Sequence, residues 1–68
     1  MSVYKMIRLV GSSSTSWEEA AKVAVEEAAK HVRDLRIAEV EMCDMRLENG
    51  TVVEYRTRIH ASFRYEGS

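Results

Sequence analysis

Four basic side chains near the end of the chain recur at even-numbered positions, on one side of a two-residue alternation: Arg56, Arg58, His60 and Arg64. Arginine matches phosphate oxygens in a fork geometry, so this stripe could bind the phosphates of a nucleotide-like ligand. The alternative is a set of salt bridges between subunits, made with Glu54, Glu66 or the carboxylates of a preceding strand. We favour salt bridges, because ten Lys and Arg residues nearly balance eleven Asp and Glu residues.

The other groups capable of chemistry are isolated in the sequence. Cys43 has no neighbouring base that would form a thiolate, so we expect an inert packing thiol. His60 stands among arginines, which disfavour uptake of a proton or a metal, and we expect a solvated or interface histidine. Trp17 is expected to pack at the start of a helix. The chain contains no nucleophile-base set, paired-carboxylate motif or P-loop. The sequence therefore predicts that the protein is not an enzyme.

Length and composition limit the class of protein further. We expect one domain over residues 1–68, and a core of this size contributes only about 3–5 kcal/mol of stability. One cysteine and two histidines provide neither an intrachain disulfide nor a cluster of zinc ligands, so self-association is the expected source of further stability. The formal charge of −1 argues against a nucleic-acid partner. The first residues resemble neither a signal peptide nor a membrane span, which predicts a cytoplasmic protein without a membrane partner.

The elements that must position these groups begin with a long strand. Residues 52–66 alternate between an apolar and a polar side, which is the pattern of a half-buried β-strand. About fifteen residues in a strand span roughly 50 Å, more than a domain of this size needs. The surplus must bend or contact a partner.

The preceding segments predict a strand, a helix and a second strand. Residues 3–10 are rich in β-branched and apolar types, and Gly11 is expected to end this strand. Two overlapping capping boxes, Thr15 with Glu18 and Ser16 with Glu19, predict a helix over residues 17–33. Its apolar stripe is mostly alanine, so the helix can approach a sheet closely.

Residues 37–48 return to an extended pattern, and Asn49-Gly50 is a strong signal for a hairpin turn. The predicted order is β-α-β-β in an α+β fold. We expect a three-stranded antiparallel sheet wrapped around one helix, with the first strand beside the third.

These segments, in this order and spacing, resemble the dodecin family. The resemblance covers nearly the whole chain and is carried by Val3-Tyr4-Lys5, Leu9-Val10-Gly11-Ser12-Ser13-Ser14-Thr15-Ser16, the alanine-rich helix, Ala38-Glu39-Val40, and Arg46-Leu47-Glu48-Asn49-Gly50 followed by Glu54-Tyr55 and Phe63. It implies a dodecin-type subunit of a hollow homododecamer with cubic symmetry. Most dodecins bind flavins in pairs and are viewed as flavin storage or buffering proteins.

Two positions depart from the flavin-binding dodecins. Their flavin-stacking tryptophan is replaced here by Ile37, and the glutamine that follows their Glu-Tyr pair is replaced by Arg56, which has donors but no acceptor. Loss of stacking on both sides would weaken binding very roughly tenfold to ten-thousandfold. By resemblance, Ile37, Arg46 and Arg56 line the ligand pocket, and a flavin (riboflavin or FMN) storage dodecin is the alternative reading.

The sequence is more similar to a branch without the tryptophan, the calcium dodecins, in five segments: Ser2-Val3-Tyr4-Lys5, Thr15-Ser16-Trp17-Glu18, Asp34-Leu35-Arg36-Ile37-Ala38, Asp44-Met45 and Tyr55-Arg56. Calcium requires several oxygen ligands. Glu39, Glu41 and Asp44 could supply some of them, with symmetry bringing copies together, but no EF-hand loop identifies the metal ligands. The sequence thus predicts a non-catalytic protein that binds or stores a small ligand or ion.

Overall fold

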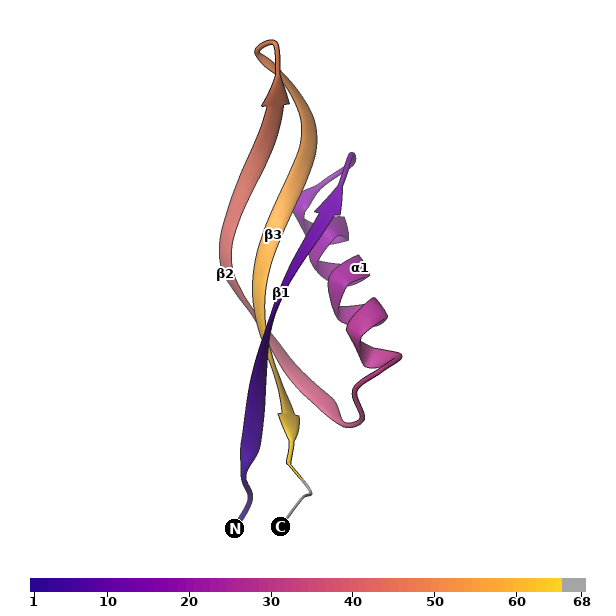
Figure 1. Ribbon diagram of the computed structural model, residues 1–68, viewed down its shortest axis with the longest axis vertical. Helices are drawn as coiled ribbons and strands as arrows, with labels where there is room; N and C mark the ends of the chain where they lie inside the picture. Colours follow the sequence, from indigo (N-terminus) through magenta and orange to yellow (C-terminus); the bar gives the residue numbers. More distant parts are fainter. Residues whose placement is uncertain (66–68) are drawn as a thin grey trace.

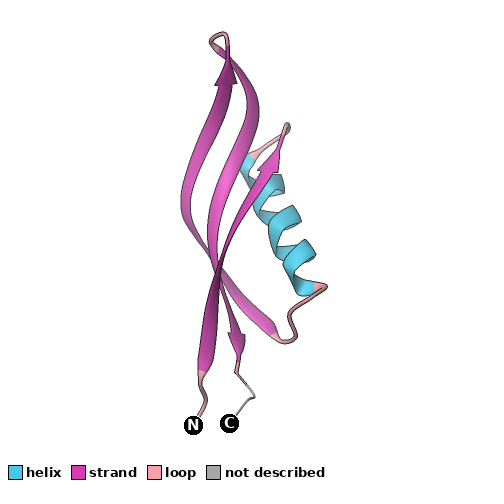
Figure 2. Ribbon diagram, viewed as in Figure 1, coloured by secondary structure: helices cyan, strands magenta, loops and turns pink. Residues whose placement is uncertain are grey.

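A computed structural model describes residues 1–65 of the chain, which form three strands and one helix. Along the chain these are β1 (Tyr4–Ser13), α1 (Trp17–Ala29), β2 (Leu35–Glu48) and β3 (Thr51–Arg64), as Figures 1 and 2 show. The predicted β-α-β-β order and α+β class are confirmed. The expected contacts of Glu66 lie outside the described residues.

The three strands form one antiparallel sheet in the order β1-β3-β2. The register pairs Tyr4 with Arg64 at one end of β1, and Glu48 with Thr51 at the tip of the β2-β3 hairpin. The last strand in the sequence, β3, is therefore the central strand, as predicted, and β1 and β2 are the two edge strands.

Helix α1 covers one face of this sheet. It packs on β1 and β3, barely touches β2, and leaves the tip of the β2-β3 hairpin projecting beyond it (Figure 1). The side chains that are at most 1% exposed lie between helix and sheet: Ala20, Thr57, Ile59 and Ala61. The predicted apolar side of β3 thus faces the helix. The resulting molecule is elongated, with extents of 51 × 19 × 14 Å.

Gly11 does not end β1, contrary to the sequence prediction, because the strand continues to Ser13. The glycine is buried against the helix. A Cβ atom at Gly11 would lie 2.8 Å from the Cβ of Ala24 and would overlap the carbonyl oxygen of Ala20. Gly11 is therefore required for close helix-sheet packing and not for a turn.

The helix starts where one of the two predicted capping boxes, Ser16 with Glu19, places it. Ser16 is the N-cap, and its Oγ accepts a hydrogen bond of 3.0 Å from the amide of Glu19. The amide of Thr15 instead donates to Oγ of Ser13 at 2.9 Å. The alanine stripe is centred on the fully buried Ala20, which lies one turn before Ala24.

The helix ends at Ala29, four residues before the predicted end. The amides of Lys30 and His31 make bonds to carbonyl oxygens three residues earlier, which tightens the last turn. Asp34 then adopts a left-handed conformation, with φ of 58°, and directs the chain into β2. Within residues 1–65, no helix has the length and apolar character needed to cross a membrane.

The hairpin and its irregularities set the register of β2. Asn49 and Gly50 have φ angles of 51° and 77°, as the predicted two-residue turn requires. The pairing shifts at three places, which leaves Arg36 and Glu41 of β2 and Val53 of β3 without a direct partner. Such bulges redirect side chains. The bulge at Glu41 lies where this side chain meets Arg8 of β1.

Candidate functional site

The helix-free face of the sheet carries the charged side chains, and cross-strand pairs organise them. Arg56 of β3 holds Asp44 of β2 in a fork, with Nε–Oδ1 and Nη2–Oδ2 distances of 2.7 and 3.0 Å. This hydrogen bond lowers the pKa of Asp44 below its usual value and raises that of Arg56. The basic stripe thus makes an ion pair with a carboxylate of β2 within one chain, and the expected salt bridges between subunits remain a prediction.

Arg46 forms a second ionic group close to the hairpin tip. Its Nη1 lies 2.7 Å from Oε2 of Glu48, and its Nε lies 3.0 Å from Oε1 of Glu54 on β3. The contact with Arg46 is the main reason that the pKa of Glu54 is lowered. Arg46 and Arg56 therefore lie near each other on the same face, each already engaged with carboxylates.

The third group joins all three strands. Nη2 of Arg8, on β1, lies 3.1 and 3.0 Å from the two carboxylate oxygens of Glu41, and Nε of Arg8 donates to Nε2 of His60 at 3.0 Å. The bond from Arg8 lowers the pKa of Glu41. Sequence reasoning missed Arg8 as a partner of His60, since 52 residues separate them and only the strand register brings them together.

The structure brings together only two of the three predicted ligand residues. Ile37 is 66% exposed and pairs with Ser62, nine residues along β2 from Arg46. At the rise of a strand, nine residues correspond to about 30 Å. One chain therefore does not form a pocket from Ile37, Arg46 and Arg56 together.

The candidate calcium ligands are also dispersed. Among residues 1–65, no group of three His, Cys, Asp or Glu side chains lies close enough to hold a metal ion. Glu41 and Asp44 are engaged with Arg8 and Arg56, and Glu39 pairs in register with His60. The carboxylates of one chain therefore do not make a complete metal site.

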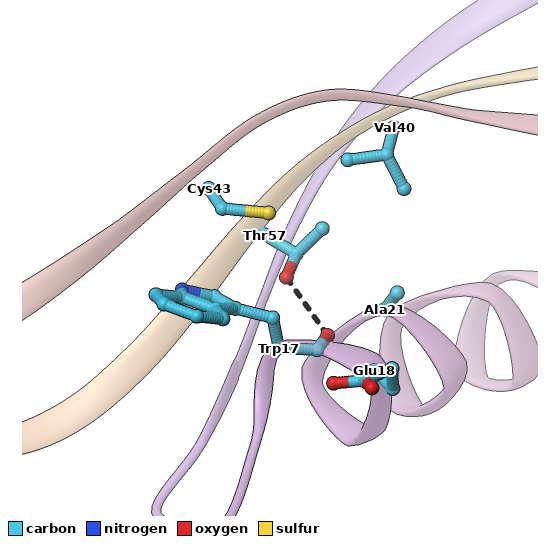
Figure 3. Close-up of a pocket in the computed structure, with 6 residues that line it drawn as sticks. All are labelled: Trp17, Glu18, Ala21, Val40, Cys43 and Thr57. Atoms are coloured by element: carbon cyan, nitrogen blue, oxygen red, sulfur yellow. Dashed lines mark hydrogen bonds between the residues drawn. The ribbon is translucent and has the colours of Figure 1, made fainter.

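A pocket of about 520 Å³ lies on the opposite, helix-bearing face, between the start of α1 and β2 (Figure 3). Trp17 forms one wall: its indole Nε1 donates to the carbonyl of Asp44 at 3.0 Å, and its ring meets that of Tyr55 edge-on at 5.2 Å. Thr57 Oγ1 donates to the carbonyl of Trp17 at 2.9 Å. Trp17 thus packs against the sheet, as expected.

The expectation of a packed thiol is wrong within one chain. Cys43 is exposed and lines this pocket together with Val40 and Ala21. It is exposed because α1 packs mainly on β1 and β3 and barely touches β2.

Comparison with known proteins settles the family. The sequence profile of the dodecins matches residues 3–66. The chain belongs to the dodecin family. This dodecin is 44% identical, over 64 residues, to the calcium dodecin of Mycobacterium tuberculosis strain H37Rv, and the match covers 94% of this chain and 90% of the relative.

Solved structures of dodecins have the same fold. A crystal structure of the M. tuberculosis protein, described as a calcium-chelating immunodominant antigen with a novel calcium-binding site, superposes with a TM-score of 0.86 at 42% identity and covers 98% and 96% of the two chains. The dodecin of Streptomyces coelicolor superposes with a TM-score of 0.91 at 28% identity and covers the same shares.

Proposed function

We propose that this dodecin is a non-catalytic protein that binds and stores an ion, foremost calcium, in a homododecamer. The observation that carries the proposal is its 44% identity to a calcium dodecin over nearly the full length of both chains. Ile37 and Arg56 stand where flavin-binding dodecins would place tryptophan and glutamine, which favours an ion over a flavin.

The uncovered strand β2 supports assembly. Its large apolar side chains are between 44% and 66% exposed, namely Ile37, Val40, Met42, Met45 and Leu47. An exposed apolar strand at the edge of a sheet is normally covered by a partner. Because one chain does not gather three metal-binding side chains within residues 1–65, we infer that the ion site is shared between copies.

Calcium titration of the metal-free oligomer tests this proposal. The oligomer is sized by light scattering, and calcium and magnesium are then titrated separately by calorimetry. We expect saturable calcium binding that magnesium does not reproduce, because calcium accepts more oxygen ligands in a more flexible geometry. A monomeric protein would contradict the assembly, and an oligomer that shows no saturable calcium binding would contradict calcium storage.

Flavin storage is the second candidate function, because Arg46 and Arg56 lie on one face of the sheet and the planar guanidinium of Arg56 could replace the missing glutamine. Trp17 does not replace the missing flavin-stacking tryptophan. It lies on the helix-bearing face of the sheet, whereas Ile37 pairs with Ser62 on the helix-free face. We expect riboflavin and FMN to bind the parent weakly and the Ile37→Trp variant at least about tenfold more tightly, measured by flavin fluorescence quenching. If quenching shows that the parent binds flavin with a micromolar or lower Kd, flavin storage would be the better supported function.

A further inference from the structure

The pocket between the start of α1 and β2 has the size of a small-molecule site. Its volume of about 520 Å³ falls within the range of about 300–1,000 Å³ that is usual for ligand pockets. Figure 3 shows Trp17 and Cys43 at one side of the space and Val40 and Ala21 at the other. The lining is therefore mostly apolar, and an aromatic ring forms one of its walls.

Trp17 is held in place through both its ring and its backbone. The indole Nε1 donates to the carbonyl of Asp44 on β2 at 3.0 Å, and the carbonyl of Trp17 accepts from Oγ1 of Thr57 on β3 at 2.9 Å. The ring also meets that of Tyr55 at an angle of 77°. A wall that is already oriented loses little freedom when a ligand binds. The face of a tryptophan ring attracts cations more strongly than that of any other aromatic side chain.

The pocket carries a negative charge and no positive one. Among the six residues that line it, Glu18 is the only acidic residue and none is basic. The ion pairs that α1 makes within residues 1–65 are those of Glu27 with Lys30 and His31, so Glu18 has no cationic partner there. A carboxylate beside an aromatic ring and apolar walls complements a cation that has an apolar body.

Other classes of ligand fit this lining less well. A phosphate or carboxylate ligand would meet the negative charge of Glu18 and no basic side chain. A metal ion requires several oxygen ligands, and Glu18 supplies the one carboxylate of the lining. A neutral apolar molecule would gain nothing from Glu18. The composition of the pocket therefore favours an organic cation.

We propose that this pocket binds an organic ammonium ion, with the cationic group near the ring of Trp17 and the carboxylate of Glu18. The alkyl groups of the ligand would then lie against Val40 and Ala21. The site is on the opposite face of the sheet from the ionic groups of Arg46 and Arg56, and it does not depend on the proposed ion store. It requires that the pocket stays open in the oligomer.

Choline is a suitable probe, because 3,3-dimethyl-1-butanol has the same shape without the charge. Each compound is titrated into the intact oligomer at matched ionic strength. The fluorescence of Trp17, the single tryptophan of the chain, reports binding. We expect saturable binding of choline that is about tenfold tighter than that of the alcohol. Equal affinities for the two compounds, or no saturable change with choline, would overturn the proposal.

A charge-removing variant assigns the effect to Glu18. Glu18→Gln should weaken choline binding about tenfold and leave binding of the alcohol unchanged, because only the charge is removed. Glu26→Gln is the matched control and should bind choline like the parent, since Glu26 lies on the same helix but outside the lining of the pocket. Choline binding that is as tight in Glu18→Gln as in the parent would overturn the proposal.

The thiol of Cys43 tests whether choline binds in this pocket and whether a second copy of the chain fills it. Cys43 is the single cysteine of the chain and lies exposed in the pocket. The uncharged reagent N-ethylmaleimide should label it in the oligomer without ligand, and choline should slow the labelling. A thiol that reacts only after unfolding would show that a neighbouring copy fills the pocket. That result, or unchanged labelling at saturating choline, would overturn the proposal.

Discussion

At the scale of single residues, the helix-free face is a surface of paired charges. Arg56 holds Asp44, Arg46 holds Glu48 and Glu54, and each pairing lowers the pKa of a carboxylate or raises that of the guanidinium. Arg56, a predicted ligand residue, therefore has an intramolecular partner. A ligand at Arg56 must compete with Asp44.

We expect the Asp44–Arg56 pair to give a defined dependence of stability on pH. Because Arg56 holds the pKa of Asp44 below 3.8, the pair stabilises the fold above that pH, and this contribution is lost as the pH falls through the lowered pKa. At neutral pH, Arg56→Gln should slightly lower Tm, and the difference from the parent should vanish in acid. Thermal unfolding at a series of pH values measures this difference in Tm. Arg36→Gln is the control, because Arg36 lies farther from its carboxylate partner, 3.8 Å from Asp34.

A persistent difference in Tm at low pH would mean that Arg56 stabilises the fold by packing and not by charge. Carbon-13 NMR of the Asp44 carboxyl then separates the two cases. Its pKa should rise in Arg56→Gln and remain low in Arg36→Gln.

The sequence predicted that the basic stripe lies on one face, but not which carboxylates it meets. Alternation along β3 is enough to place Arg56 and His60 on the same side. Their partners depend on the register of β2, and the unpaired Glu41 shifts that register by one residue. A shift of one residue moves a side chain to the other face of a sheet, so local pattern alone does not give the pairs Arg8–Glu41 and Arg56–Asp44.

At the scale of the elements, the helix is fixed by its cap and by one close contact with the sheet. Ser16 accepts from the Glu19 amide, and Gly11 lets the backbone at Ala20 approach β1. The sequence predicted the helix start well, because capping is local. It misplaced the helix end and the role of Gly11, because both depend on contacts with residues distant in sequence or on an unusual backbone conformation at Asp34.

The cap provides a test with a neighbouring control. Ser16→Ala should lower the free energy of unfolding by about 1 kcal/mol, since the Glu19 amide loses its acceptor. Thr15→Ala should have almost no effect, because the Thr15 side chain makes no hydrogen bond within residues 1–65. Chemical denaturation of both variants measures the difference. Equal losses would contradict the assignment of Ser16 as the N-cap.

Gly11 provides a second test at this scale. Gly11→Ala should destabilise the fold by about 1–3 kcal/mol, because the added methyl group overlaps the Ala20 carbonyl and forces helix and sheet apart. The adjacent, exposed Ser12→Ala should change stability by no more than about 0.5 kcal/mol. Urea unfolding compares the two. A stable Gly11→Ala protein would show that α1 can shift without loss of packing.

At the scale of the whole molecule, one chain leaves part of its sheet uncovered. One helix covers two of the three strands, so β2 exposes apolar side chains and a free backbone edge along its length. The sequence predicted surplus strand, because about fifteen residues in a strand exceed what a domain of this size needs. It placed that surplus in residues 52–66 and not in β2. It did not predict the 520 Å³ pocket that this arrangement leaves between Trp17 and Val40.

We expect assembly to depend on this uncovered strand. Val40→Glu places a charge on an apolar side chain that is 55% exposed, so a subunit that covers it would have to bury an unpaired carboxylate. Light scattering should show loss of the oligomer, whereas Lys22→Glu, on the exposed surface of α1, should assemble normally. An intact Val40→Glu oligomer would mean that neighbouring subunits cover other parts of the sheet.

The position of β3 between β1 and β2 also determines when the protein can fold during translation. β1 makes no backbone bond with β2, and its ladder joins residues as distant as Tyr4 and Arg64. When the ribosome has made β1, α1 and β2, no two of these strands can pair in the native way. The nascent chain must therefore remain without its sheet until β3 has emerged, and β1 and β2 then gain their common partner together.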